Sequence, residues 1–237
     1  MDITQYLAFL PSNAPDTSVP VLLLYELNIF AKAVIAQFID EAGVSPKTAD
    51  PVGVIASHIF TYSTFRWNDT SLIDILLAKL HVVCPVLFGI YGDDTTNEGR
   101  RRIGWWRGVE GGPWVSEQRH CERMTGLGAG FAALGTRNYS KTEMKNPFPN
   151  YKYWQSLSYI LNTPQQAITQ THLVVLKAMI ESNETRILEI FGSAGKVVLR
   201  QALLEFPKRN PGLQRSVAAV ALGGLADVLK KDKKIYL

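Results

Sequence analysis

The spacing of apolar residues constrains this 237-residue sequence most strongly, because they recur every three to four positions over most of the chain. In DTSLIDILLAKLHVV, for example, the residues Leu72, Ile75, Leu76, Leu80 and Val83 share one face of a helix with 3.6 residues per turn. No stretch alternates in the way that would indicate a competing strand pattern. The sequence therefore predicts an all-α fold of about nine to eleven helices. Since no fixed-period repeat accompanies them, we expect an irregular HEAT-like array of helical pairs.

Residues 1–20 are predicted to form an irregular lead-in, because Pro11, Pro15 and Pro20 interrupt them and few apolar residues follow Leu10. Residues 21–237 are predicted to form a single helical-repeat-like domain, since 46% hydrophobic content suffices for one core. Within that domain the helical pattern breaks over residues 85–115, a glycine-rich segment longer than most connections. We expect this segment to be an ordered excursion.

Local signals refine the expected helices. Asp50 is predicted to cap the helix in DPVGVIASHIFTYSTF, and Ser116 the helix in SEQRHCERMTGLGAGFAALGTR. The glycines that begin at Gly126 predict a helix thin enough for close packing rather than a phosphate-binding turn, because no strand precedes them and Phe131 stands where GxGxxG needs glycine. The prolines of NPFP predict an extended backbone before the helix that contains Trp154, which we expect in the core with Leu157, Ile160 and Leu161.

Composition excludes several functional classes. Two cysteines in apolar or helical surroundings indicate packing thiols rather than a disulfide framework. The apolar run VPVLLLYELNIFAKAVIAQFI contains Glu26 and Lys32, so it predicts a buried helix and not a membrane span. His120 and Cys121 are adjacent and point about 100° apart on a helix, which cannot make a nucleophile and base pair. The histidines and cysteines also lack the spacing of a metal site. We therefore expect that this protein is not an enzyme.

Three lysines suggest a binding site. Lys32 and Lys79 stand on apolar helical faces, and Lys196 follows GSAG near a predicted helix start, where backbone N–H groups favour anions. A single lysine on an apolar helical face is usually explained by its long side chain, which lies along the apolar surface while the ammonium group reaches water. Together they predict a convergent cationic pocket.

The segment 100–107, RRRIGWWR, has two interpretations. Arginines beside Trp105 and Trp106 are the ingredients of a base-stacking platform for RNA. Alternatively, and with more weight, the tryptophans anchor the long loop to the core while the arginines face water.

Four motifs in order resemble one known family. They are KLHVVCPVLFGIYG from Lys79, EGRRRIGWWR from Glu98, ERMTGLGAGFAALG from Glu122 and NPFPNYKYWQSLSYILNTPQQAITQTHLVVL from Asn146. Between about Leu22 and about Leu204 the chain resembles the C-terminal domain of the GLE-type mRNA-export mediators of the nuclear pore. The resemblance implies a HEAT-like fold similar to the middle domains of translation-initiation scaffolds. In the family another basic residue comes from helices upstream of this chain's first residue, so the sequence is either an N-terminally truncated fragment or a short gene model, and the resemblance leaves open whether an N-terminal coiled-coil region is missing.

The same resemblance implies a function. GLE-type domains activate the ATPase of the DEAD-box RNA helicase of mRNA export at the cytoplasmic face of the nuclear pore complex, and they are not enzymes themselves. Inositol hexakisphosphate fills the gap between the two proteins, and a second surface receives the C-terminal segment of an FG nucleoporin. Translation factors are further implied partners. The implied localisation is the nuclear envelope and the cytoplasm. Direct RNA binding through residues 100–107 is the alternative function.

The resemblance also assigns ligand residues. Lys32, Lys79 and Lys196 match family positions that contact inositol hexakisphosphate, and His81 and Arg200 lie close enough in sequence to add positive charge. This chain departs from the yeast-like pattern at three positions, because Ala36 replaces a histidine, and Val82 and Val83 replace a basic pair. With fewer cations, we expect weaker binding of the polyphosphate.

Overall fold

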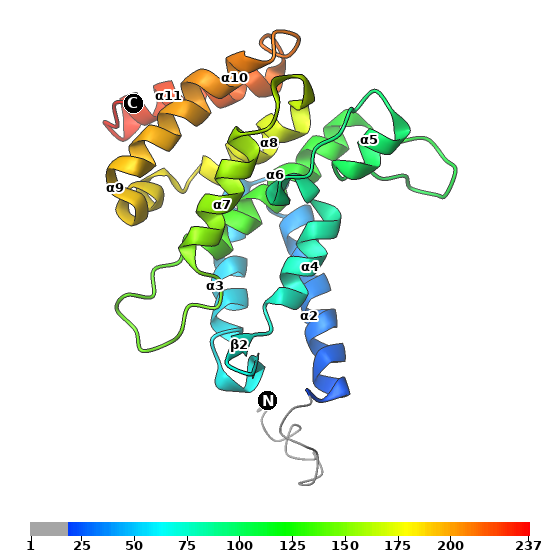
Figure 1. The fold of residues 1–237 in the computed structure, drawn as a ribbon, viewed down its shortest axis with the longest axis vertical. Coiled ribbons are helices and arrows are strands. Elements are labelled where there is room, and N and C mark those ends of the chain that lie inside the picture. Colours follow the sequence, from blue (N-terminus) through cyan, green and yellow to red (C-terminus); the bar gives the residue numbers. More distant parts are fainter. Residues whose placement is uncertain (1–18) are drawn as a thin grey trace.

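The computed structural model describes residues 19–237, and Figure 1 shows them as a stack of helices. The predicted lead-in therefore lies almost wholly outside the described residues. The α-helices are α2 (Val21–Asp40), α3 (Ala49–Ile59), α4 (Asp74–Val83), α5 (Asn97–Arg102), α6 (Glu117–Gly135), α7 (Asn150–Leu161), α8 (Gln170–Ile180), α9 (Glu184–Arg200), α10 (Phe206–Arg209) and α11 (Val217–Asp232). Short helical turns are η1 (Pro46–Thr48), η2 (Ser63–Phe65), η3 (Pro85–Phe88), η4 (Gln165–Ala167) and the π-helical η5 (Gln201–Glu205).

The predicted all-α fold is confirmed. The strands among residues 19–237 are β1 (Arg66–Trp67) and β2 (Thr70–Ser71), which pair antiparallel in the connection between α3 and α4. The ten α-helices of the described range fall within the number that the sequence predicts. Their buried apolar residues, from α2 through α11, form one continuous cluster.

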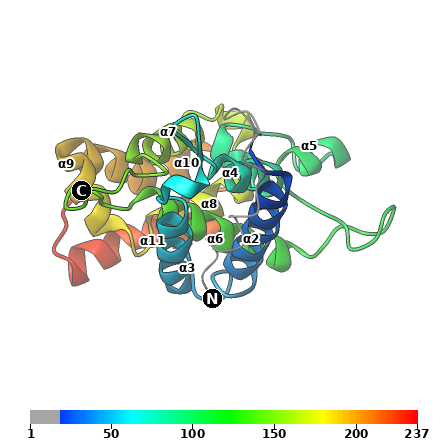
Figure 2. The ribbon, with the colours of Figure 1, turned by 90° about the horizontal axis from the view of Figure 1, so that it is seen from below.

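Helix α6 is the centre of this array, packing most extensively against α8 and also against α2 and α3. Figures 1 and 2 show α9 and α11 on one side of it, and α2, α4 and α5 on the other. The helix axes approach closely because α6 carries glycine at its contacts. A Cβ atom at Gly126 would lie 1.9 Å from the Phe38 carbonyl oxygen, and one at Gly130 would lie 2.3 Å from the Phe38 ring. The predicted thin helix is confirmed, and these glycines form no phosphate-binding turn.

Helix α7 corrects one core prediction. Pro149 precedes it in the expected extended conformation (φ −58°, ψ 142°), and Leu157, Ile160 and Leu161 are buried. The fully buried aromatic residue, however, is Tyr153, whose hydroxyl donates to the Met179 carbonyl at 2.9 Å. Trp154 is only partly buried and packs against Phe191, with ring centroids 4.9 Å apart. Both residues are aromatic, so the sequence could not show which of two neighbours 100° apart faces the core.

Of the two predicted caps, one is correct. Ser116 caps α6, its hydroxyl accepting from the Arg119 amide at 3.3 Å. Asp50 lies inside the first turn of α3, so the capping prediction is wrong. Its carboxylate instead pairs with Arg186, at 2.6 Å between Nη1 and Oδ1, and with Arg137, which follows α6. These guanidinium groups, Arg186 foremost, lower the pKa of Asp50.

The excursion over residues 85–115 contains structure of its own. Helix α5 lies in its middle, capped by Thr96, whose hydroxyl accepts from the Gly99 amide at 2.9 Å. An antiparallel bridge between Arg107 and Trp114 then closes a projecting loop. Figure 2 shows this loop extending away from the helices.

Within residues 19–237, α2 alone is long and apolar enough to cross a membrane by length and composition. About a third of its apolar window, 33%, is buried, and the buried side packs against α4 and α6. The sequence predicts a buried helix here, and the structure meets that prediction only in part, because one face of α2 is buried while Val21 and Tyr25 are exposed. The two free cysteines fit the predicted packing role: Cys84 is buried and Cys121 half-buried.

Candidate functional site

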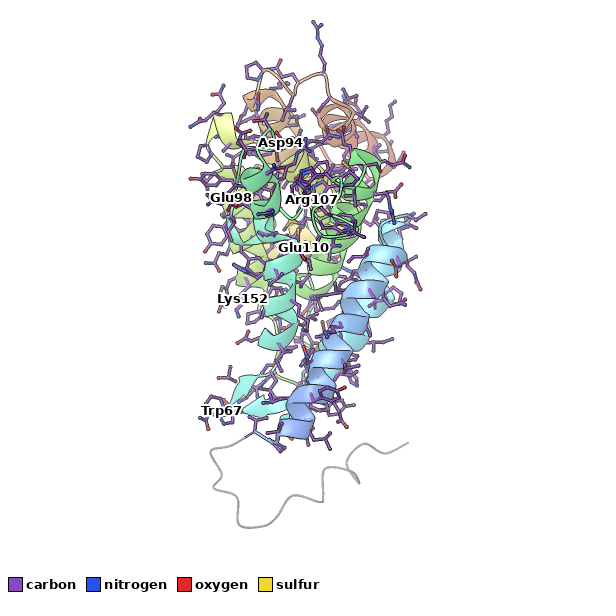
Figure 3. The ribbon with its side chains drawn as sticks, turned by 90° about the vertical axis from the view of Figure 1, so that its right-hand side faces the viewer. Trp67, Asp94, Glu98, Arg107, Glu110 and Lys152 are labelled. Atoms are coloured by element: carbon purple, nitrogen blue, oxygen red, sulfur yellow. The ribbon has the colours of Figure 1, made fainter. Side chains whose placement is uncertain are left out.

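A cavity with a volume of about 610 Å³ lies between α2 and α4. It is lined by Asn28, Lys32, Ile35, Ile75, Ala78, Lys79, Val82 and Val83, and we call it the α2–α4 groove. Figure 3 looks onto this side of the molecule, where the two helices run side by side. Residues spaced three or four apart on each helix share one face, which explains how eight residues from two segments meet.

Lys32 and Lys79 are the cationic residues of the groove. Lys32 is exposed and Lys79 half-buried, so their aliphatic parts lie along apolar walls while the ammonium groups reach water. Across the described range, neither lysine has a carboxylate within ion-pair distance. Two uncompensated positive charges beside an apolar surface favour an anionic ligand.

The remaining predicted ligand residues lie elsewhere. The His81 ring packs against Phe88, with centroids 4.9 Å apart, and does not line the groove. Lys196 and Arg200 belong to α9, which Figures 1 and 2 place on the opposite side of the molecule from α2. Arg200 faces Glu205, 3.9 Å away. The predicted convergence therefore holds for Lys32 and Lys79 and not for Lys196.

The predicted helix start near Lys196 is confirmed, although the predicted convergence of Lys196 with the other two lysines is not. Helix α9 is broken at Gly192, whose backbone is non-helical (φ 56°, ψ −129°), so a second helical segment starts just before Lys196. Glycine is suited to this conformation because it has no Cβ atom. The sequence could locate this helix start, but not the face of the molecule to which it belongs.

The groove also includes one residue that the sequence analysis did not predict and two at which this chain differs from the yeast-like family pattern. Asn28 precedes Lys32 by four residues and shares its face, a signal available in the sequence. Val82 and Val83 line the groove directly, and Val82 is 73% exposed. The positions at which this chain lacks the basic pair therefore belong to the same surface as the two lysines.

The tryptophans of the 100–107 segment anchor the excursion. Trp105 stacks on His120 of α6, with centroids 4.0 Å apart and an interplanar angle of 13°, and the Arg100 guanidinium lies 5.1 Å from its centroid. Trp106 faces Arg123 of α6 at 4.3 Å. These contacts favour the anchoring interpretation, because rings held in this way are not free to stack on bases.

Buried titratable groups in this region are held neutral. Burial, together with Arg123 and Arg100, lowers the pKa of His120 to about 3, and its Nε2 lies 2.8 Å from the Thr171 hydroxyl. Burial raises the pKa of the Cys84 thiol to about 12 and also raises that of Cys121. The described residues contain no group of three or more His, Cys, Asp or Glu side chains placed to hold a metal ion.

Comparison with known proteins identifies the family. The family model described as GLE1-like protein matches residues 1–203. The chain belongs to the GLE1-like family. The resemblance inferred from the sequence motifs is thereby confirmed, and the matched range contains both groove helices and most of the helical array.

Curated relatives of this GLE1-like chain are fungal. The mRNA export factor GLE1 of Chaetomium thermophilum is 49% identical over 222 residues, which cover 94% of this chain and 41% of that protein. The mRNA export factor GLE1 of Saccharomyces cerevisiae is 30% identical over 176 residues, covering 73% and 31%. The chain thus spans between about a third and two fifths of the length of these relatives.

A solved structure shares the fold of the GLE1-like chain. It is a complex of the C-terminal domain of a Saccharomyces cerevisiae Dbp5 variant with Gle1 and IP6. The TM-score is 0.75 at 27% identity, over 89% of this chain and 69% of the matched chain. A second complex, with a Gle1 variant, gives a TM-score of 0.74 at 26% identity.

Proposed function

We propose that this GLE1-like domain is an mRNA-export mediator that activates the ATPase of a DEAD-box RNA helicase, with inositol hexakisphosphate held at the α2–α4 groove. The observation that carries this proposal is the match to a chain in a complex that contains Dbp5, Gle1 and IP6. The groove supports it independently, because it presents Lys32 and Lys79, and neither forms an ion pair with a carboxylate in the described range.

The charge of the groove suggests how the ligand acts. Two lysines cannot neutralise a polyphosphate, so most of its charge remains available to cations of a second protein. Such a ligand bridges two basic surfaces that would otherwise repel each other, and its contribution to association weakens as salt screens it. In this proposal Lys32 and Lys79 are the phosphate contacts of this chain. Lys196, Arg200 and His81 make no direct contact with the same ligand.

Further partners and the location follow from the family. We propose a nucleoporin segment and translation factors as additional partners, at surfaces other than the α2–α4 groove. The site of action is the cytoplasmic face of the nuclear pore complex. The domain acts as a regulator and performs no chemistry of its own.

Stimulation of a DEAD-box ATPase tests the proposal. We expect the domain to raise the ATPase rate of its helicase partner more in the presence of inositol hexakisphosphate than in its absence. The double substitution Lys32→Gln and Lys79→Gln should remove the part that depends on the polyphosphate. Lys196→Gln is the matched control, since it removes a lysine charge from α9. No stimulation by the unaltered domain, or equal loss in both variants, contradicts the proposal.

RNA binding by the 100–107 segment remains a separate function to be tested. Arg101 and Arg102 are exposed and could contact phosphates, although Trp105 and Trp106 are engaged with α6. Direct binding predicts RNA affinity that falls steeply with salt and falls again on Arg101→Gln and Arg102→Gln. Unchanged affinity in that variant excludes the segment as an RNA site.

A further inference from the structure

A second cavity, with a volume of about 230 Å³, lies where four segments of the chain meet. It is lined by the excursion at Asp94 and Arg100, by the start of α6 at Glu117, by the start of α8 at Thr171, and by Leu213 before α11. None of its lining residues belongs to the α2–α4 groove. The kind of ligand that this cavity fits therefore depends on side chains that only the tertiary structure brings together.

The side chains of the cavity carry more negative than positive charge. Asp94 and Glu117 both line it, and neither forms an ion pair with a residue in the range 19–237. The guanidinium of Arg100 lies 5.1 Å from the Trp105 ring centroid, and its Nε donates to the backbone carbonyl of Asp94 at 2.7 Å. Two carboxylates and one guanidinium leave a charge of −1 among the lining residues, which favours a cationic ligand.

The carboxylate of Asp94 is only weakly compensated. Burial raises its pKa, the neighbouring carboxylates of Asp93 and Glu117 raise it too, and Arg100 opposes them. Burial and like charge both disfavour the ionised form of an acid. A cation in the cavity would reduce both penalties, because it would replace lost hydration and offset the repulsion between the carboxylates.

Two further polar atoms at the cavity lack partners. The His120 side chain is 1% exposed, its Nε2 lies 2.8 Å from the Thr171 hydroxyl, and its Nδ1 has no hydrogen-bond partner among the described residues. The ring is neutral at pH 7, so Nδ1 is an acceptor when the proton is on Nε2. The indole Nε1 of Trp105 is a buried donor, likewise without a partner in that range. Both residues line the cavity, which therefore fits a ligand that carries donors as well as an acceptor.

An organic cation fits these groups better than a metal ion. The described residues contain no group of three or more His, Cys, Asp or Glu side chains placed to hold a metal. A guanidinium is planar, always charged, and carries five N–H donors in a geometry that matches carboxylates. In a peptide, a backbone carbonyl stands beside such a side chain and supplies the acceptor that the Trp105 indole lacks.

We propose that this cavity binds an arginine side chain of a partner protein, with the carboxylates of Asp94 and Glu117 accepting from its guanidinium. A carbonyl oxygen of the same partner segment accepts from the Trp105 indole. The site is separate from the α2–α4 groove, and the inference holds whether or not that groove binds a polyphosphate.

Titration of the 237-residue chain with N-acetyl-arginine N-methylamide tests this inference. The indole N–H resonance of Trp105 is followed by NMR, since this group lines the cavity. We expect a saturable shift of that resonance. The corresponding citrulline derivative has nearly the same shape without the charge, and we expect it to bind at least about tenfold more weakly.

Three variants separate the cavity from general surface charge. Asp94→Asn and Glu117→Gln each keep the shape of the side chain, and each should raise the dissociation constant of the arginine derivative at least about tenfold. Glu98→Gln is the matched control, because it removes a carboxylate from an exposed position on α5 that does not line the cavity. Its dissociation constant should stay within about twofold of the unaltered chain. Thermal unfolding establishes that each variant is folded.

Four results would overturn the proposal. They are the absence of a saturable shift in the unaltered chain, equal affinity for the arginine and citrulline derivatives, an equal loss of affinity in all three folded variants, and tighter binding of the matching lysine derivative. The last result would mean that the cavity recognises an ammonium group and not a guanidinium.

Discussion

Val82 and Val83 stand where the yeast-like family pattern has a basic pair, so restoring positive charge there directly tests whether the α2–α4 groove binds a polyphosphate. Both residues line it together with Lys32 and Lys79. We expect the double substitution Val82→Lys and Val83→Lys to tighten the binding of inositol hexakisphosphate, because it adds two positive charges to a surface that already holds two.

The expected gain in affinity depends on how exposed the two substituted side chains are to solvent. A unit charge pair 4 Å apart is worth about 1 kcal/mol in bulk water and about 4 kcal/mol in the effective dielectric near a protein surface. Val82 is 73% exposed, so the lower figure applies there, and side-chain ordering reduces both contributions. We therefore expect about 2 kcal/mol in total, which corresponds to a dissociation constant roughly thirtyfold lower.

Isothermal titration calorimetry at low and at high salt measures this change. The control is the double substitution Val217→Lys and Val220→Lys on α11, which adds the same net charge at residues that are 83% and 63% exposed and lie away from the groove. Because Val83 packs partly against the core, thermal unfolding of each variant is measured in parallel. The gain should shrink at high salt, since the Debye length falls from about 10 Å at 0.1 M to about 3 Å at 1 M.

Two results would refute the reasoning. No gain in a folded Val82 and Val83 variant would mean that the groove does not hold the polyphosphate. An equal gain in the α11 control would mean that affinity follows net charge and not this site.

Three further predictions concern stability. Trp154→Ala should cost about 2 kcal/mol in urea unfolding, because the ring is only partly buried. A cost of roughly 3 to 5 kcal/mol, typical of a fully buried tryptophan, would contradict this placement. Asp50→Asn should destabilise by about 1 kcal/mol or less, since the side chain is 43% exposed. Because folding lowers the pKa of Asp50, the stability difference should persist above about pH 4 and disappear as the pH falls through the folded pKa. Unfolding measured from about pH 7 down to about pH 2 will show this. Gly126→Ala should lower the free energy of unfolding by more than about 3 kcal/mol, because its Cβ would collide with the Phe38 carbonyl. Gly224 has open space around it, so Gly224→Ala should leave the stability unchanged or raise it slightly. Similar effects of the two substitutions would contradict the close packing of α6.

Local signals in the sequence predicted most of the helices. Apolar residues every three to four positions specify a helix wherever they occur, and the Ser116 cap follows from a hydroxyl placed to accept from a free amide. The glycines of α6 were also interpreted correctly, because a run without side chains permits close approach whatever the partner is. The family resemblance followed from the order of the motifs.

Tertiary structure alone decided which residues meet. Lys32 and Lys79 share a groove because α2 packs against α4, while Lys196 is carried to the far side by α9. Asp50, predicted as a cap, pairs instead with arginines 87 and 136 positions away in sequence. Local spacing determines the face of a helix on which a residue lies, but the partner of that face depends on how all the helices bury their apolar sides together.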